Sequence, residues 1–185
     1  MYGIWNRLQY MLSPQFDIYE QVSKIVSGRV ADVGSGTGFG THLLARCADR
    51  VRGYEVDTMA RDFAQRAFSN GSIQFYELDI CRTADVKRLQ KMANFVTMID
   101  VIEHIETDDI AIKNCKMLLM DNGIFICSTP NRLSRYRKSD YHVREYSPDE
   151  LKSLLKSAFD NVEILDYQLK PIETEYANPI IGMCS

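Results

Sequence analysis

A glycine-rich loop lies between a strand pattern and a helix pattern near the start of the chain. The strand-like run at residues 29–33 leads into Asp-Val-Gly-Ser-Gly-Thr-Gly at residues 32–38, and apolar residues then recur at helical spacing from Phe39. Glycines allow a left-handed backbone and the close approach of a ligand. The N-terminus of the helix that follows offers free amide hydrogens with a partial positive charge. The loop therefore predicts a strand–loop–helix unit that cradles an anion, although a tight turn without ligand is the simpler alternative.

The rest of the chain alternates short β-branched runs with helical patterns. This alternation is typical of an α/β fold, in which a mostly parallel sheet has helices on both faces. We expect seven strands, in a Rossmann-like arrangement. The last two have no helix between them, so we expect an antiparallel last strand. The predicted strands are residues 29–33, 51–56, 73–78, 95–99, 124–128, 162–169 and 180–184.

Length and charge limit the organisation and the partners of the chain. Its 185 residues fit one domain, 1–185, with an expected N-terminal helical cap at 1–28 and a lid segment at 130–147. The formal net charge of −3 disfavours strong nucleic-acid binding, which needs a basic surface. Five widely spaced cysteines and the lack of a run of ~18 apolar residues favour a cytoplasmic protein without a membrane span. Nothing in the sequence fixes the oligomeric state, and a homodimer stays open.

Two carboxylates follow neighbouring predicted strands. Glu55 ends the second strand, where it could accept hydrogen bonds from both hydroxyls of a ribose. Asp79 follows the third strand, where it could accept a hydrogen bond from an adenine amino group. The alternatives are a surface glutamate and a loop-capping aspartate. Since ligands bind at the carboxyl ends of strands in open α/β sheets, the two residues predict an adenosine pocket beside the anion cradle.

Taken in order, these motifs resemble those of class I S-adenosylmethionine-dependent methyltransferases. The glycine loop, GYEVD (53–57) and ELDI (77–80) are similar to the first three motifs of that class. The later motifs resemble the small-molecule O-methyltransferase branch, which contains ubiquinone-biosynthesis enzymes and enzymes of glycan or natural-product pathways. One departure is Asp121-Asn122-Gly123, where that branch usually has Pro-Gly-Gly. The later motifs are MIDVIEHI (98–105), LLMDNGIFICSTPNR (118–132) and HVREYSPDEL (142–151).

The resemblance implies S-adenosyl-L-methionine as the cofactor and assigns residues to it. The loop glycines would surround its methionine part, Glu55 would hold the ribose, and Asp79 with the Ile80 amide would hold the adenine. Asp100 would form a wall near the methionine. The predicted cofactor residues are Asp32, Gly34, Gly36, Gly38, Glu55, Val56, Asp79, Ile80 and Asp100.

Methyl transfer to a hydroxyl also needs a group that takes up its proton. His104 follows the fourth strand and His142 lies after the fifth, and an imidazole of pKa ~6.5 suits this role at neutral pH. Both are therefore predicted catalytic residues, although His104 could merely cap the following helix. The third histidine, His42, lies inside the first predicted helix and is expected to be packed or exposed. The predicted acceptor-contacting residues are Glu103, Tyr141 and Tyr146.

A divalent metal site is an alternative use of the same residues. Glu103, His104 and His142, with Asp100, carry the carboxylate and imidazole groups that bind such ions. Glu103 and His104 are adjacent rather than at ligand spacing along a helix, so we expect no metal there.

The leading functional hypothesis is O-methylation of a small-molecule hydroxyl, on a sugar derivative, a quinone precursor or a natural product. Protein methylation is a second reading, and a non-catalytic cofactor-binding module that needs a partner is a third. The Asn-Pro-Pro-Tyr type of motif that marks base-amino methylation is absent after the fourth strand. A dehydrogenase is disfavoured because its fingerprint needs a glycine where Phe39 stands.

Overall fold

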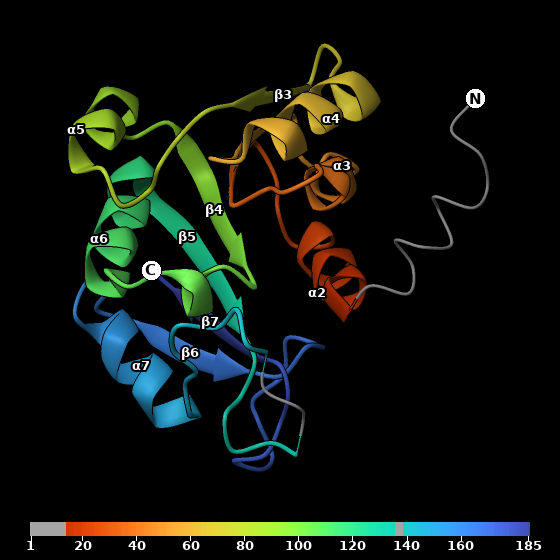
Figure 1. Ribbon diagram of the computed structural model, residues 1–185. Helices are drawn as coiled ribbons and strands as arrows, with labels where there is room; N and C mark the ends of the chain where they lie inside the picture. Colours follow the sequence, from red (N-terminus) through yellow and green to blue (C-terminus); the bar gives the residue numbers. More distant parts are fainter. Residues whose placement is uncertain (1–13, 136–138) are drawn as a thin grey trace.

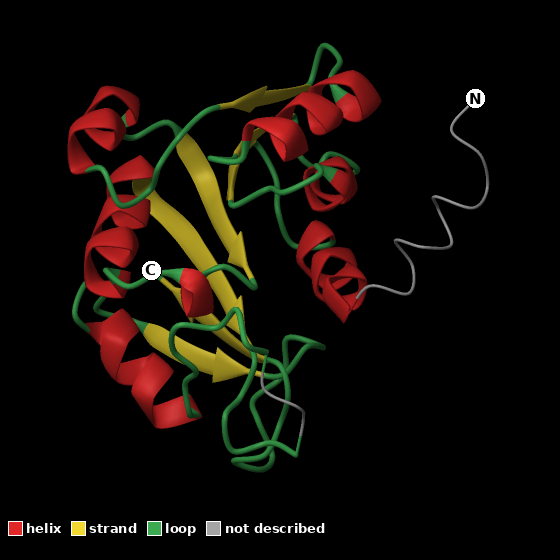
Figure 2. Cartoon of the chain, in the orientation of Figure 1, coloured by secondary structure: helices red, strands yellow, loops and turns green. Residues whose placement is uncertain are grey.

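The computed structural model describes residues 14–135 and 139–185, and in them seven strands form one sheet (Figures 1 and 2). The strand order is β3-β2-β1-β4-β5-β7-β6. All neighbours pair in parallel except β7, which runs antiparallel to both β5 and β6. The predicted mixed sheet with an antiparallel last strand is therefore confirmed. The strands are β1 (Arg29–Val33), β2 (Arg50–Tyr54), β3 (Ile73–Tyr76), β4 (Ala93–Ile99), β5 (Leu119–Thr129), β6 (Val162–Leu165) and β7 (Ile180–Cys184).

Helices cover both faces of the sheet, as predicted. In Figure 1, α2, α3 and α4 lie on one side of the sheet, and α5, α6 and α7 lie on the other. Two large apolar clusters separate the helices from the strands, one on each face. The helices are α2 (Pro14–Ser23), α3 (Phe39–Leu44), α4 (Thr58–Phe68), α5 (Thr83–Val86), α6 (Asp108–Leu118) and α7 (Pro148–Lys156), with 3-10 turns η1 (Lys87–Leu89) and η2 (Ile102–His104).

Two helices begin where side chains cap them. The Asp57 carboxylate accepts from the Ala60 amide at 2.7 Å at the start of α4. At the start of α7, Ser147 and Glu150 form a reciprocal capping box, which satisfies amides that otherwise lack a partner at a helix N-terminus. These caps fix where α4 begins after β2 and where α7 begins.

The structure also corrects some boundaries. β5 begins at Leu119 and runs through residues 121–123, whereas the predicted strand begins at residue 124. The register against β4 changes between Ala93 and Phe95, and Asn122 has a φ of 62°. β6 ends at Leu165 rather than at residue 169, because a turn closes there.

The predicted cap at 1–28 and lid at 130–147 are only partly covered. Residues 1–13 and 136–138 lie outside the described residues, and the described part of the cap contains α2, which packs against α3. Among the described helices, none combines the length and the apolar character that crossing a bilayer requires.

Candidate functional site

The loops that follow β1, β2, β3 and β4 border a cleft of about 360 Å³. This volume lies within the usual range of small-molecule sites, about 300–1,000 Å³. Asp79, predicted to meet the adenine, and His104, a predicted catalytic residue, both line it. The other predicted residues in its wall are Gly34, Glu55, Val56, Ile80 and Asp100, and those the sequence did not single out are Val33, Tyr54, Leu78, Cys81, Val101 and Ile105.

Two glycines of the loop have separate structural reasons. Gly36 has φ 53°, and a Cβ built there would meet nothing within 4 Å, so its backbone faces open space. Gly38 has φ 85°, and a Cβ there would lie 2.7 Å from both Ala64 and Phe75. Gly38 therefore allows the start of α3 to pack against α4 and β3, whereas Gly36 leaves room for a ligand.

Glu55 fixes the loop to the end of β2. Its Oε2 accepts from the Gly36 amide at 2.8 Å and its Oε1 from the Asp57 amide at 2.9 Å. Each carboxylate oxygen has two lone pairs and can accept a further donor. Arg61 donates to the Glu55 carbonyl at 2.9 Å and holds the turn. Glu55 is thus a pre-positioned acceptor in the cleft wall.

Asp32 is completely buried and does not line the cleft. Its carboxylate accepts from Tyr19 at 3.1 Å, Thr97 at 2.7 Å and Thr41 at 2.6 Å. Burial raises its pKa to about 6, although these three hydroxyls pull the pKa down. In place of the predicted cofactor contact, the structure gives Asp32 the role of joining α2, α3 and β4 beneath the loop.

The loop after β3 is held from both sides. The Asp79 carboxylate accepts from the Cys81 amide at 2.9 Å, which is the loop-capping contact weighed above. The Asn114 amide, from α6, donates to the Ile80 carbonyl at 2.7 Å. Asp79 and Ile80 therefore line the cleft on a fixed backbone.

Asp100 turns the chain at the end of β4. Its φ of 52° is left-handed, a conformation that aspartate tolerates better than most residues. The Ser128 hydroxyl donates to Asp100 Oδ1 at 2.6 Å, and the Asp100 amide donates to the Ser128 carbonyl at 3.1 Å. Burial raises the pKa of Asp100, while hydrogen bonds from Ser128 and Gln15 lower it. This turn places η2, with Glu103 and His104, beside the cleft.

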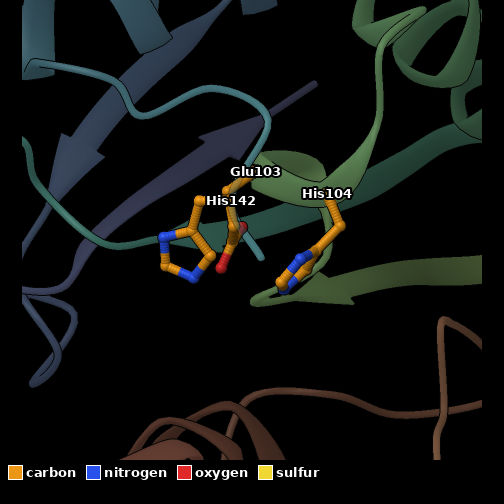
Figure 3. Close-up of side chains that lie close together, drawn as sticks. All are labelled: Glu103, His104 and His142. Carbon is orange, nitrogen blue, oxygen red and sulfur yellow. The ribbon is translucent and has the colours of Figure 1, made fainter. Parts of the chain in front are cut away.

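Glu103, His104 and His142 point toward one another (Figure 3). One ligand atom from each lies within 4.8 Å of the others, and the two imidazole centroids are 5.0 Å apart. His104 Nδ1 lies 3.0 Å from the Tyr141 carbonyl, and His142 Nδ1 lies 2.9 Å from the Glu145 carboxylate. Because a carbonyl and a carboxylate only accept, each Nδ1 donates in these contacts, and Nε2 is the ring nitrogen left for another partner.

Glu103 is the buried member of this group, with 1% of its surface exposed. Its Oε2 atom has no hydrogen-bond partner among the described residues. Burial and the nearby Asp100 carboxylate raise its pKa to about 8, although a hydrogen bond with Thr129 pulls the pKa down. Its carbonyl accepts the amides of Val143 at 2.8 Å and Arg144 at 3.2 Å, which brings His142 alongside.

The two predicted acceptor-contacting tyrosines do not line the cleft. Tyr141 is 84% exposed, and its carbonyl rather than its ring serves the site. Tyr146 is buried, and its hydroxyl donates to Asp108 at 2.7 Å, where Arg144 also donates at 2.8 Å. These bonds anchor the segment that carries His142. Sequence reasoning missed Glu145, although its spacing three residues after His142 is a usable signal.

Comparisons with known proteins show which family this chain resembles. A family model described as a methyltransferase domain matches residues 7–164. A Mycolicibacterium smegmatis protein named a probable S-adenosylmethionine-dependent methyltransferase is 28% identical over 79% of this chain and 57% of its own length. A ubiquinone biosynthesis O-methyltransferase of Haemophilus ducreyi is 29% identical over 62% of this chain and 50% of its own length. The chain thus spans about half the length of these relatives.

The fold is shared with solved structures. One of them, from Thermotoga maritima, is titled a SAM-dependent methyltransferase and a possible histamine N-methyltransferase. It superposes with a TM-score of 0.75 at 17% identity, and the match covers 97% of this chain and 93% of that chain. The fold is that of class I methyltransferases. The chain belongs to the methyltransferase domain family. The predicted class is thereby confirmed, with S-adenosylmethionine as the cofactor of that class.

Proposed function

We propose that this chain transfers a methyl group from S-adenosylmethionine to a hydroxyl of a small molecule. The observation that carries the proposal is the position of His104 in the wall of the same cleft as Glu55 and Asp79. A group with a free Nε2 lone pair therefore adjoins the predicted nucleoside site. The name of the Haemophilus ducreyi relative supports an oxygen acceptor.

The residues of the cleft fit the cofactor. Glu55 offers two carboxylate oxygens for ribose hydroxyls, and Asp79 with Ile80 forms a fixed wall for a purine. Open space at Gly36 leaves room for the amino-acid part. When bound, the cofactor supplies a methyl group on a positively charged sulfur, which needs no further activation.

The chain must then orient the acceptor and take up its proton. A hydroxyl is a weak nucleophile, and loss of its proton to a positioned base speeds such reactions by roughly 10²–10⁴-fold. His104 Nε2 can accept that proton, since its Nδ1 already donates to Tyr141. His142 stands next to it with the same tautomer, held by Glu145.

Turnover with a panel of acceptors tests the proposal. The protein would be incubated with S-adenosylmethionine and catechols, phenols, sugar derivatives or peptides, and S-adenosylhomocysteine and methylated product would be measured by mass spectrometry. We expect product from a small hydroxyl compound. Methylation of peptides alone would favour the protein-methyltransferase reading. Cofactor binding without turnover on any acceptor would favour the non-catalytic module and overturn the proposal.

A further inference from the structure

One side-chain cluster beside the cleft has the composition of a metal centre. Glu103, His104 and His142 each place a ligand atom within 4.8 Å of the others. Two imidazoles and one carboxylate form a donor set that suits zinc-type divalent cations better than Mg²⁺, which prefers oxygen ligands. Adjacency of Glu103 and His104 in the sequence argued against such a site, but both side chains extend from η2 into the same group (Figure 3).

Both histidines are already oriented as metal ligands usually are. A ligating histidine generally donates its second ring N–H to a carbonyl or a carboxylate, which fixes the ring and raises its basicity. His104 donates to the Tyr141 carbonyl at 3.0 Å, and His142 donates to the Glu145 carboxylate at 2.9 Å. Glu145 and His142 are nearly buried side chains, so this contact is more than a solvated surface pair. The Nε2 atoms are left for a common ligand.

Glu103 supplies an independent sign of a missing partner. Its side chain is 99% buried, and Oε2 has no hydrogen-bond partner in the described part of the chain. A buried polar atom without a partner costs about 1–3 kcal/mol, so a structure usually retains one for a reason. A cation between the carboxylate and the two imidazoles would satisfy it.

From this geometry we propose that Glu103, His104 and His142 bind a zinc-type divalent cation at the acceptor end of the cleft. Three protein ligands leave at least one coordination position open, as in catalytic zinc sites. The site adjoins the cleft because His104 is in its wall.

The role of the cation, unlike its binding, rests on the proposed function. An acceptor hydroxyl in the open position would have a lowered pKa: its O–H bond breaks, the electron pair stays on oxygen, and the proton passes to solvent water. With the cation bound, Nε2 of each histidine is a ligand atom, so solvent water takes the proton that His104 would accept in the cation-free site. Since His142 comes from the segment tied to Glu103 by two amides, the cation would also hold that segment against η2.

Binding is tested on the full chain without cofactor or acceptor. The protein is treated with a chelator and titrated with Mn²⁺, and free Mn²⁺ is followed by electron paramagnetic resonance, which avoids thiol binding of Zn²⁺ at the exposed Cys47. We expect one bound equivalent, displaced by Zn²⁺ but not by the same concentration of Mg²⁺. No stoichiometric binding, or equal displacement by Mg²⁺, would overturn the proposal.

Variants locate the site. His104→Ala and His142→Ala should each weaken Mn²⁺ affinity at least ~10-fold, and Glu145→Gln, which touches no cation, by roughly 10-fold. His42→Ala is the matched control, because this histidine lies in α3, stacked on Phe68 away from the cluster, and it should bind like wild type. Wild-type affinity in both cluster histidine variants would refute the assignment.

A second readout does not depend on methyl transfer. Cation should slow tryptic cleavage after Arg144 in wild type but not in His142→Ala, if the cation holds this segment. The same cleavage rate in wild type with and without cation would show that the cation does not hold this segment against η2. Because neither assay uses the methyl donor, failure of the cation site and failure of the methyltransferase proposal give different results.

Discussion

The two ends of the cleft are built from different kinds of contact. At the proposed nucleoside end, Glu55 directly follows β2 and Asp79 lies three residues after β3, and each accepts from the amide two residues further on, at Asp57 and Cys81. At the proposed acceptor end, His104 contacts the segment of His142 across a sequence separation of 37 residues. The contacts of the first end join residues close in sequence. The contacts of the second end depend on how the segment that carries His142 packs against η2. Damage to each end should therefore affect a different property.

His104→Ala is expected to have the largest effect. Turnover should fall by ~100-fold or more, because the acceptor end loses its base or its metal ligand. The affinity for S-adenosylhomocysteine, measured by calorimetry, should change by no more than about twofold, because the nucleoside end is untouched. His42→Ala should behave like wild type in both assays. A large loss of nucleoside affinity in His104→Ala would contradict the separation of the two ends.

Glu55→Ala should show the reverse pattern. The variant removes the predicted ribose acceptor and the anchor of the Gly36 amide, so affinity for S-adenosylhomocysteine should fall about 10–100-fold. Mn²⁺ affinity at the Glu103 cluster should not change. Glu163→Ala, an exposed position on β6, is the matched loss of one carboxylate and should leave nucleoside binding intact.

These contrasts also explain what the sequence could predict. The positions of Glu55 after β2 and of Asp79 after β3 follow from local patterns of apolar and polar residues in the sequence. Asp32 shows the limit, because its partners Tyr19 and Thr97 come from 13 residues before it and 65 residues after it. A motif position alone could not distinguish a buried anchor from a ligand contact.

Tyr146 shows the same limit at the acceptor end. An aromatic residue within the predicted lid suggests a pocket wall, yet its hydroxyl donates to Asp108 of α6, 38 residues away. Conversely, adjacency of Glu103 and His104 argued against a shared ligand. Both residues lie in η2, whose three residues are too few to show a periodic pattern in the sequence.

Asp32→Asn should reduce stability by about 1–3 kcal/mol, because the amide nitrogen would face hydroxyl donors. The wild-type carboxyl has a folded pKa of about 6, raised from 3.8 by burial. The folded state therefore keeps a proton that the unfolded chain releases between these values. The stabilisation that comes from binding this proton is complete below pH about 3.8 and is lost as the pH rises through about 6. Urea unfolding at pH 4.5 and 7 gives the difference in the free energy of unfolding between wild type and Asp32→Asn. This difference should be smaller at pH 7, and a constant or larger difference at pH 7 would refute the role of Asp32.

Tyr146→Phe is expected to have the smallest effect and tests how firmly the acceptor end is anchored. The change removes one hydroxyl but keeps the buried ring, and Arg144 still donates to the same Asp108 oxygen at 2.8 Å. We expect a loss of about 1 kcal/mol in the free energy of unfolding. Tyr167→Phe, which removes a more exposed hydroxyl, should cost less. Because His142 lies in the anchored segment, Mn²⁺ affinity should fall a few-fold while nucleoside affinity stays constant. A loss of nucleoside affinity instead would show that the two ends are coupled through α6, whose Asn114 holds the Ile80 carbonyl.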